Sequence, residues 1–288
     1  MRTLKTVRAF CVKSIVVFRA LSLDVVSGAI ACGWMAQIHT ESSLPLAWLV
    51  ILGFSVWAVY TADHLLDAMK LGINAAMYRH RFHAIHIVPL GVACFISASI
   101  ALSLALIVMD FKVVLMGFLT GGVAMLHFGA IWWAAKRNIL WPFKELGVAS
   151  IYTIGVWGPP ILMCTKAIPW LLIIGFGGIG LTNLIAFSYH ENEADTSGGQ
   201  PSLSRFLGER RACWVGLACC LFSLVLVSLS FKANQMDVLL ITIVISMGSC
   251  QAVLFFLPRK WTQSEAYRIW GDAAFSLPWI YVCASILS

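Results

Sequence analysis

The sequence predicts an all-α membrane protein that crosses the bilayer several times. Of its 288 residues, 60% are hydrophobic and only 11% are charged, whereas a soluble domain carries about 25% charged residues. The apolar residues form runs of about 20, the length that a helix needs to cross the hydrocarbon core. These runs lack the alternation of a transmembrane β-barrel. Because backbone groups in lipid must be satisfied within the chain, we expect helices with membrane lipid as their solvent.

About nine apolar runs have the length of a spanning helix, and we expect them to pack as one bundle. No linker rich in Pro, Gly or Ser divides the chain, so residues 1–288 are predicted to form a single membrane-embedded domain. The fifth run is interrupted by Gly158-Pro159-Pro160, and the last run is short. The runs cover residues 14–37, 45–66, 86–109, 113–135, 145–164, 168–189, 212–231, 236–257 and 272–287.

The distribution of Lys and Arg predicts the orientation of the chain, because these residues concentrate in cytoplasmic loops. With the N-terminus inside, sixteen of the 20 basic residues lie on the cytoplasmic side, and Lys112, Lys166 and Lys232 lie outside. We therefore expect an integral multi-pass protein of a bacterial inner membrane, with its N-terminus in the cytoplasm. The net charge of +7 follows from this bias. No basic stretch has the interleaved aromatic residues of an RNA-binding surface, so no nucleic-acid partner is expected.

Two acidic motifs lie where the second and sixth apolar runs end, both on the predicted cytoplasmic side. Asp63 and Asp67 are four residues apart, and so are Glu191 and Asp195, so each pair shares one face of a helix. Ionisable residues at membrane depth are costly and therefore indicate a functional site. The alternative is that both pairs are interfacial charges that only mark the ends of two helices.

Four carboxylates that face one cavity would repel one another unless cations lay between them. Oxygen ligands suit Mg²⁺, which proteins usually hold with one or two carboxylates together with substrate phosphates. We therefore expect Asp63, Asp67, Glu191 and Asp195 to bind Mg²⁺ beside a phosphorylated substrate. Basic residues near the motifs are candidates to neutralise the remaining phosphate charge. They are Arg79, Arg81, Lys136, Arg137, Lys144 and Arg205.

The segment from Glu191 to Gly208 resembles the second aspartate-rich motif of the UbiA superfamily, the intramembrane prenyltransferases. That motif has an acidic residue, an Asp four positions later, a Gly, then Thr or Ser followed by Leu, and finally Leu-Gly. Here Asp195, Ser202-Leu203 and Leu207-Gly208 occupy the later positions in the same order. The match covers about 18 residues, and the pattern of helices and cytoplasmic loops agrees with the family over the whole chain.

The first family motif, Asn-x-x-x-Asp-x-x-x-Asp, is matched at its two aspartates by Asp63 and Asp67. Val59 replaces the Asn, and its side chain has no ligand oxygen. Arg19, in the first apolar run, resembles a family arginine. Tyr152, followed by Thr153, resembles a Tyr-Ser/Thr pair in the fifth helix.

The resemblance implies Mg²⁺-dependent transfer of an isoprenyl group from an isoprenyl diphosphate to a lipophilic acceptor, such as a quinone precursor or a tetrapyrrole. The four acidic residues would act in catalysis together with Tyr152, and Arg19 would join the basic residues at the diphosphate. Departure of the diphosphate would leave an allylic cation, which packed helices shield from water and aromatic faces stabilise.

Two other functions fit the same pattern. A terpene cyclase of the same superfamily needs the same metal site and a closed cavity, but no acceptor. A transporter or assembly protein that kept the fold without catalysis would explain Val59. Transporters often contain helices broken by Gly and Pro in both halves; here Gly158-Pro159-Pro160 is the one clear break, and the first half has no clear counterpart.

Several other polar residues lie near these motifs. His80, His83 and His86 recur at every third position, a spacing that could place a metal or haem ligand set on a helix. Because no carboxylate is adjacent in the sequence, we expect solvated histidines next to phosphate-binding arginines. Asp272 begins the last run, where we expect it to cap a helix and to interact with the helix dipole.

Overall fold

The computed structural model describes residues 16–75, 77–234, 237–258 and 265–287, and all regular secondary structure in these ranges is helical. The predicted all-α fold is therefore confirmed. The longer helices are α2 (Leu23–His39), α3 (Ala47–Leu71), α5 (Ile87–Val108), α6 (Phe111–Lys136), α7 (Lys144–Leu162), α8 (Trp170–Gly198), α10 (Glu209–Asn234) and α11 (Val238–Leu254). The shorter ones are η1 (Gly72–Asn74), α4 (Tyr78–Ile85), α9 (Leu203–Leu207), α13 (Ala266–Ala274) and α14 (Pro278–Leu287).

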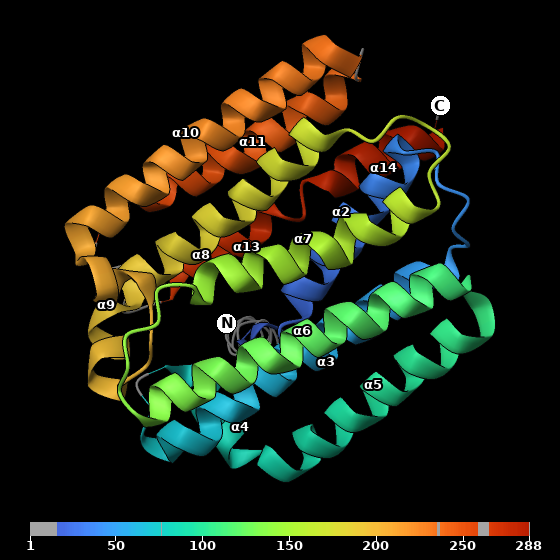
Figure 1. Cartoon of the computed structure of the whole chain (residues 1–288). Helices are drawn as coiled ribbons and strands as arrows, with labels where there is room; N and C mark the ends of the chain where they lie inside the picture. Colours follow the sequence, from blue (N-terminus) through green and yellow to red (C-terminus); the bar gives the residue numbers. More distant parts are fainter. Residues whose placement is uncertain (1–15, 76, 235–236, 259–264, 288) are drawn as a thin grey trace, which may run out of the picture.

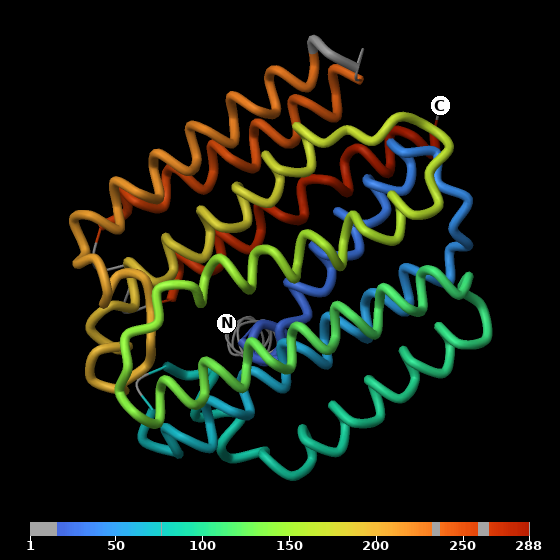
Figure 2. Tube along the Cα trace, in the orientation of Figure 1, coloured from blue at the N-terminus to red at the C-terminus, as the bar shows by residue number. Residues whose placement is uncertain are grey.

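The helices form a bundle with α8 in its interior (Figures 1 and 2). Helix α8 packs against α7, α10 and α11, while α2 packs against α3, α7 and α14. Segments from the two ends of the chain therefore lie side by side. In the most apolar part of α8, 67% of the residues are buried, compared with 11% in α5 and 17% in α6. Helices α5 and α6 thus belong to the outer wall of the bundle.

The outward faces of α5 and α6 are apolar and suit a lipid environment. Phe95, Ile107 and Leu126 are 74%, 80% and 76% exposed. Six described segments are long and apolar enough to cross a membrane, and α11 is a shorter apolar helix. Every predicted apolar run contains a helix. The expected multi-pass membrane architecture is therefore confirmed, and the number of nine spans remains a prediction.

Helix α7 runs through Gly158-Pro159-Pro160 and ends at Leu162, so the expected interruption of the fifth run is absent. Proline lacks the N–H that bonds to the carbonyl four residues earlier, and it usually breaks a helix interior. Here both prolines lie in the last turn, and Met163 N still donates to Pro159 O at 3.3 Å. The Gly-Pro-Pro sequence is thus a helix end and not a break in the middle of a span.

Aromatic residues fill the interior between α7, α8 and the connection from α13 to α14. Trp157 and Phe176 are fully buried, with ring centroids 5.9 Å apart. Phe176 also stacks on Tyr152 at 6.1 Å and meets Phe275 edge-on at 6.2 Å. Such pairs stabilise a core beyond the effect of their buried area. This aromatic core fixes α7 against α8.

The two short helices α4 and α9 lie at the same end of the bundle (Figure 1). The connections and helix ends on this side hold most of the described Lys and Arg residues and follow both acidic motifs. The connections at residues 40–46, 109–110 and 163–169 lie at the opposite end. Successive connections thus alternate between the two ends of the bundle, as the predicted topology requires. Which end faces the cytoplasm remains a prediction.

Replacing Trp157 with Ala should remove the centre of the aromatic core. Trp157 is 0% exposed, and truncation of a buried Trp costs about 3–5 kcal/mol of unfolding free energy. We expect the unfolding temperature of the detergent-solubilised protein to fall by several degrees. Trp170→Ala removes the same side chain at a position that is 57% exposed and should change little. Equal losses in both variants would contradict this description of the core.

Candidate functional site

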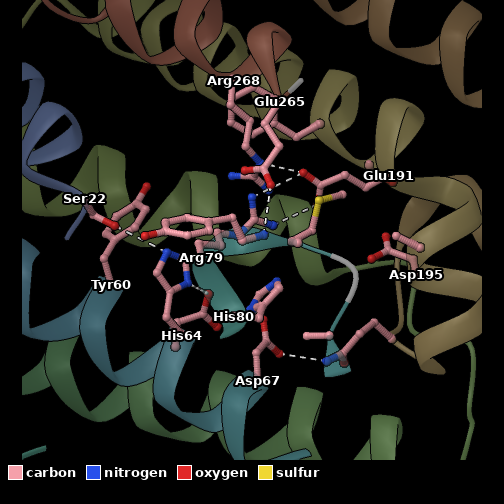
Figure 3. Close-up of a pocket in the computed structure, with 18 of the residues that line it drawn as sticks. Ser22, Tyr60, His64, Asp67, Arg79, His80, Glu191, Asp195, Glu265 and Arg268 are labelled. Atoms are coloured by element: carbon pink, nitrogen blue, oxygen red, sulfur yellow. Dashed lines mark hydrogen bonds and ion pairs between the residues drawn. The ribbon is translucent and has the colours of Figure 1, made fainter. Parts of the chain in front are cut away.

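A cavity of about 690 Å³ lies between α2, α3, α4, α7, α8 and α13, at the end of the bundle where α4 and α9 lie. Its wall carries many charged side chains (Figure 3). The acidic ones are Asp24, Asp63, Asp67, Glu145, Glu191, Asp195, Glu265 and Asp272, and the basic ones are Arg19, Arg79, Lys144 and Arg268. Charges inside a membrane bundle are tolerated where they face one another or water. This gathering of charge marks the cavity as the candidate site.

The two acidic motifs meet in this cavity. Asp63 and Asp67 lie one turn apart near the end of α3, and Glu191 and Asp195 lie one turn apart on α8. The side chains of Asp63 and Asp67 are 34% and 20% exposed, compared with 9% for Glu191. Val59 is not part of the cavity lining. The spacing that places each pair on one helix face thus brings four carboxylates to one cavity.

Glu191 accepts hydrogen bonds from two arginines and a tyrosine. Arg79 Nη2 donates to Glu191 Oε2 at 3.0 Å, and Arg79 Nη1 lies 3.5 Å from Oε1. Arg268 Nε donates to Oε1 at 2.5 Å, and the Tyr267 hydroxyl donates to the same oxygen. Arg79 lies on α4, whereas Tyr267 and Arg268 lie on α13. This cluster, which we call the Glu191 cluster, therefore ties α4 and α13 to α8.

The Glu191 cluster is enclosed by aromatic rings. Tyr267 is fully buried, and its ring stacks on that of His190 with centroids 4.6 Å apart. The guanidinium of Arg268 lies over the Phe187 ring at 4.5 Å. Two guanidinium groups and one carboxylate leave a net positive charge at the cavity wall. The cluster is thus a structural tie and a source of positive potential inside the site.

Asp67 connects α3 with the segment that follows α8. Gln200 Nε2 donates to Asp67 Oδ1 at 2.9 Å, and His80 Nδ1 lies 3.8 Å from Oδ2. Nearby, Lys70 Nζ donates to Gly199 O at 2.9 Å. Gly199 has a φ of 64°, the left-handed conformation in which glycine commonly ends a helix. These contacts hold the end of α8 against α3, so both acidic motifs face the same space.

Three of the seven basic residues that we expected at a diphosphate line the cavity. Arg19 Nε lies 3.7 Å from Asp24 Oδ2, and Arg79 belongs to the Glu191 cluster. Lys144 begins α7, and its charge interacts with those of the aspartates of both motifs. The cavity therefore has cations on the segment before α2, on α4 and on α7, as well as on α13.

The other four of these basic residues lie outside the cavity lining. Lys136 and Arg137 are exposed at the end of α6, where each lies over a neighbouring Trp ring. Arg81 donates to a backbone carbonyl at 2.8 Å, and Arg205 donates to Gln200 O at 2.5 Å. Proximity in the sequence suggested that these residues line the site. The fold directs them to the surface and to the backbone of the loops.

Tyr152 lies in a small chamber of about 30 Å³ that adjoins the main cavity. The two spaces share Tyr60, Asn183 and Asp272 in their walls. Phe275 forms part of the far wall and meets Tyr152 edge-on, with ring centroids 5.8 Å apart. Tyr152 therefore faces the apolar end of the site, next to the aromatic core, and not the acidic motifs.

The histidines after the first motif form a buried cluster, so the expectation of solvated side chains was wrong for two of them. His80 and His83 are 6% and 1% exposed, and both rings meet His64 edge-on. His86 is exposed. Burial, together with the charge of Arg79, lowers the pKa of His80 to about 2, and burial lowers the pKa of His83. Neutral imidazoles therefore pack between α3 and α4.

Arg268 and Asp272 are among the residues of the cavity that were not predicted from the sequence. Arg268 contacts Glu191 across 77 residues of sequence, and its only signal was a basic residue ahead of an apolar run. Asp272 was expected at the start of a helix, but α13 begins at Ala266 with Glu265 before it. Asp272 instead lies in the second half of α13 and lines the cavity. The sequence signal that we missed was the four-residue spacing of Arg268 and Asp272, which places the carboxylate one helical turn after the arginine.

The carboxylates differ in how well they fit a hard divalent cation. Asp63, Asp67 and Asp195 line the cavity, and no arginine of the described ranges is bound to them, whereas both oxygens of Glu191 accept hydrogen bonds from arginines. Among the described residues, no three His, Cys, Asp or Glu side chains form a ready metal centre. Mg²⁺ does not need one, because phosphate oxygens and water usually complete its ligands. The aspartate side of the cavity therefore fits a metal that binds with a phosphorylated ligand.

Comparison with known proteins places the fold. No protein-family model and no curated protein sequence matches the chain. The structure is similar to the apo structure of a UbiA homologue from Aeropyrum pernix K1, with a TM-score of 0.71 and 14% identity over 91% of this chain and 98% of that one. It is also similar to a UbiA homologue from Archaeoglobus fulgidus bound to DMAPP and Mg²⁺, with a TM-score of 0.65 and 12% identity over 91% and 96% of the two chains. The chain therefore has the fold of the UbiA homologues, as the resemblance implied.

Removal of the Glu191 carboxylate should strongly destabilise the protein. Glu191→Ala leaves two largely enclosed guanidinium groups, 11% and 19% exposed, without their closest counter-charge, which costs about 3–5 kcal/mol of unfolding free energy. Thermal unfolding in detergent would measure the loss. Glu193→Ala is the matched control, because Glu193 is exposed on the same helix, and surface changes are usually within about 0.5 kcal/mol. Similar unfolding temperatures for the two variants would show that the cluster stabilises nothing.

Stability should fall on acidification through His80. The unfolded chain protonates this residue below a pH of about 6.5, whereas the folded chain keeps it neutral down to a pKa of about 2. Its contribution to the unfolding free energy is therefore intact above pH 6.5 and is lost below it, by up to about 1.4 kcal/mol per pH unit. Unfolding temperatures from pH 7.5 to 5 should fall less in His80→Asn than in the wild type. The exposed His86→Asn control should follow the wild type, and an unchanged slope in His80→Asn would disprove the assignment.

Proposed function

We propose that the chain is a divergent member of the UbiA superfamily that transfers an isoprenyl group from an allylic diphosphate to a lipophilic acceptor within the membrane. One observation carries this proposal. The acidic motifs of α3 and α8 face one charged cavity at the loop end of a bundle with the UbiA fold. A structure with that fold is bound to DMAPP and Mg²⁺, which supports the same class of ligand here.

The diphosphate would lie between the two motifs. Mg²⁺, held by Asp63, Asp67 and Asp195, would neutralise the charge of the leaving diphosphate. Arg19 and Lys144 line the same cavity and would add positive charge from α7 and from the segment before α2. Because a cation beside a phosphate oxygen forms a strong, charge-assisted hydrogen bond, these residues would also fix the orientation of the donor.

The isoprenyl chain would lie in the main cavity, along the side that borders the small chamber at Tyr152. Val25, Val148 and Leu184 supply apolar walls there, and Tyr60 and Tyr152 supply aromatic rings. Ring faces attract a positive charge and would stabilise the allylic cation after the diphosphate leaves. The packed helices around the chamber would keep out the water that otherwise captures such a cation.

The acceptor would meet the cation where the main cavity and the chamber join. Asp272 and Asn183 line both spaces, and Oδ1 of Asn183 is buried without a hydrogen-bond partner among the described residues. An unsatisfied buried oxygen favours binding of a donor. We therefore propose that these two side chains hold a hydroxyl or N–H group of an electron-rich acceptor, such as a quinone precursor or a tetrapyrrole.

The two alternative functions would use the same cavity, but the first needs no acceptor and the second involves no chemical reaction. A terpene cyclase would convert the allylic diphosphate alone. A transporter or assembly protein would bind a ligand and release it unchanged. The helical path of α7 through Gly158-Pro159-Pro160 removes the helix break that favoured a transporter. Val59 removes one expected ligand, but the three aspartates of the cavity remain available for a metal.

The proposal predicts that Mg²⁺ tightens binding of geranyl S-thiolodiphosphate, an analogue that resists cleavage, to the detergent-solubilised protein. Asp67→Ala and Asp195→Ala should each weaken binding in Mg²⁺ by roughly tenfold or more, because each removes a charged ligand group. Glu193→Ala, exposed on α8, should bind as the wild type does. Absence of binding in Mg²⁺, or binding that ignores both aspartates, would refute the proposed site.

Product analysis then separates the enzymatic alternatives. The protein would be incubated with geranyl diphosphate and Mg²⁺, with and without a quinone-precursor phenol, and the products identified by mass spectrometry. A transferase should form the prenylated phenol and free diphosphate only when the phenol is present. A cyclised hydrocarbon formed without the phenol would favour the cyclase.

A further inference from the structure

The Glu191 cluster makes Glu191 unsuitable as a metal ligand. Its oxygens accept hydrogen bonds from Arg79 at 3.0 Å and from Arg268 at 2.5 Å. A Mg²⁺ ion binds an oxygen at about 2.0–2.1 Å and would here lie against two positively charged side chains. Like charges at such a distance repel each other. Glu191 is thus the counter-ion of two arginines.

The same arginines keep hydrogen-bond donors for a ligand. In the part of the chain that the structure describes, Arg268 donates hydrogen bonds only through Nε. Its two terminal amino groups, Nη1 and Nη2, have no acceptor among those residues. Nε of Arg79 is buried and lacks a partner among the described residues. Both arginines line the cavity beside Glu191 (Figure 3). Guanidinium groups with unused donors at a cavity wall are suited to phosphate oxygens.

The cavity is therefore divided by charge. Asp63, Asp67 and Asp195 form one side, where three carboxylates outnumber the single cation Lys144, so this side needs a metal before it can approach a phosphate. Arg79 and Arg268 form the other side, where guanidinium groups offer hydrogen-bond donors to a phosphate without a metal, although Glu265 and Asp272 also interact with them. Both sides face the same space of about 690 Å³. A ligand with two linked phosphoryl groups can contact a metal on one side and the guanidinium groups on the other.

We propose, resting on the function proposed above, that Arg79 and Arg268 bind the diphosphate directly and take the place of a metal on the second acidic motif. Glu191 binds no metal and positions the two guanidinium groups. Arg268 is then a diphosphate-binding residue. A divalent metal binds on the aspartate side only, and the site retains weaker affinity for a diphosphate when no metal is present.

Binding of geranyl S-thiolodiphosphate to the full chain in detergent, measured by calorimetry in Mg²⁺ and again in EDTA, tests the assignment. The wild type should bind in both conditions, more tightly in Mg²⁺. Arg268→Gln should weaken binding roughly tenfold to a hundredfold in both, the loss expected for hydrogen bonds to a charged group. Asp67→Asn should weaken it in Mg²⁺ and leave binding in EDTA nearly unchanged. Arg210→Gln, an exposed arginine of α10, controls for the loss of one positive charge.

The number of metal ions bound per chain is a second test, because it does not change if Glu191 only stabilises the structure. Mn²⁺, titrated in the presence of the thiolodiphosphate and followed by electron paramagnetic resonance, should bind at one site per chain. Glu191→Gln, which keeps the shape and an acceptor oxygen, should still bind one Mn²⁺ ion per chain. Two Mn²⁺ sites in the wild type, one of them lost in Glu191→Gln, would overturn the proposal and make Glu191 a metal ligand. The wild-type stoichiometry decides the question if that variant does not fold.

Failure of this inference is distinguishable from failure of the proposed function. If the wild type does not bind the thiolodiphosphate in Mg²⁺, the proposed function fails. If the wild type binds in Mg²⁺ but not in EDTA, or if Arg268→Gln binds as the wild type does, the function stands and the role of the arginines is refuted. Arg268→Lys is the second variant if Arg268→Gln does not fold. It keeps the charge without the planar donors and should lose affinity less than Arg268→Gln.

Discussion

The ion pairs of Glu191 with Arg79 and Arg268 hold together the end of the bundle that contains the cavity. Helix α4 has eight residues and α13 has nine, and isolated helices of this length are unstable in water. Their positions depend on contacts with longer helices. Because Glu191 lies on α8, the most enclosed helix, it attaches both short helices to the rigid interior. The charges of the cavity are therefore part of the framework that forms the cavity.

A second set of polar contacts defines the opposite wall. Asp67 accepts a hydrogen bond from Gln200, and Lys70 donates to the carbonyl of Gly199, so the end of α3 and the end of α8 are joined where both helices leave the apolar interior. An Asp that also interacts with a buried His and a Gln has little rotational freedom. Preorganised charge stabilises a developing charge without a cost of reorganisation. The wall that would hold a metal is thus ordered by the protein itself.

Local rules predicted the features that depend on local spacing. A run of about 20 apolar residues specifies a spanning helix wherever it lies, and a four-residue interval places Asp63 and Asp67 on one face. Partners brought together by packing could not be predicted in this way. Glu191 meets Arg79 across 112 residues and Arg268 across 77, and no periodicity links these positions. The histidine pattern was visible, but its burial depends on how α4 folds back against α3. Arg81 and Arg205 show the converse, since basic residues near a motif in the sequence point away from the cavity.

The outer wall has a consequence for how much of the fold a sequence can reveal. Helices α5 and α6 present side chains such as Phe95 and Leu126 to lipid, where many apolar residues of different shape serve equally well. A structure of the same fold is only 14% identical to this chain, so the fold does not require particular residues at most positions. What distinguishes such a protein from any other apolar bundle is then the small set of charged residues that face one another in its cavity.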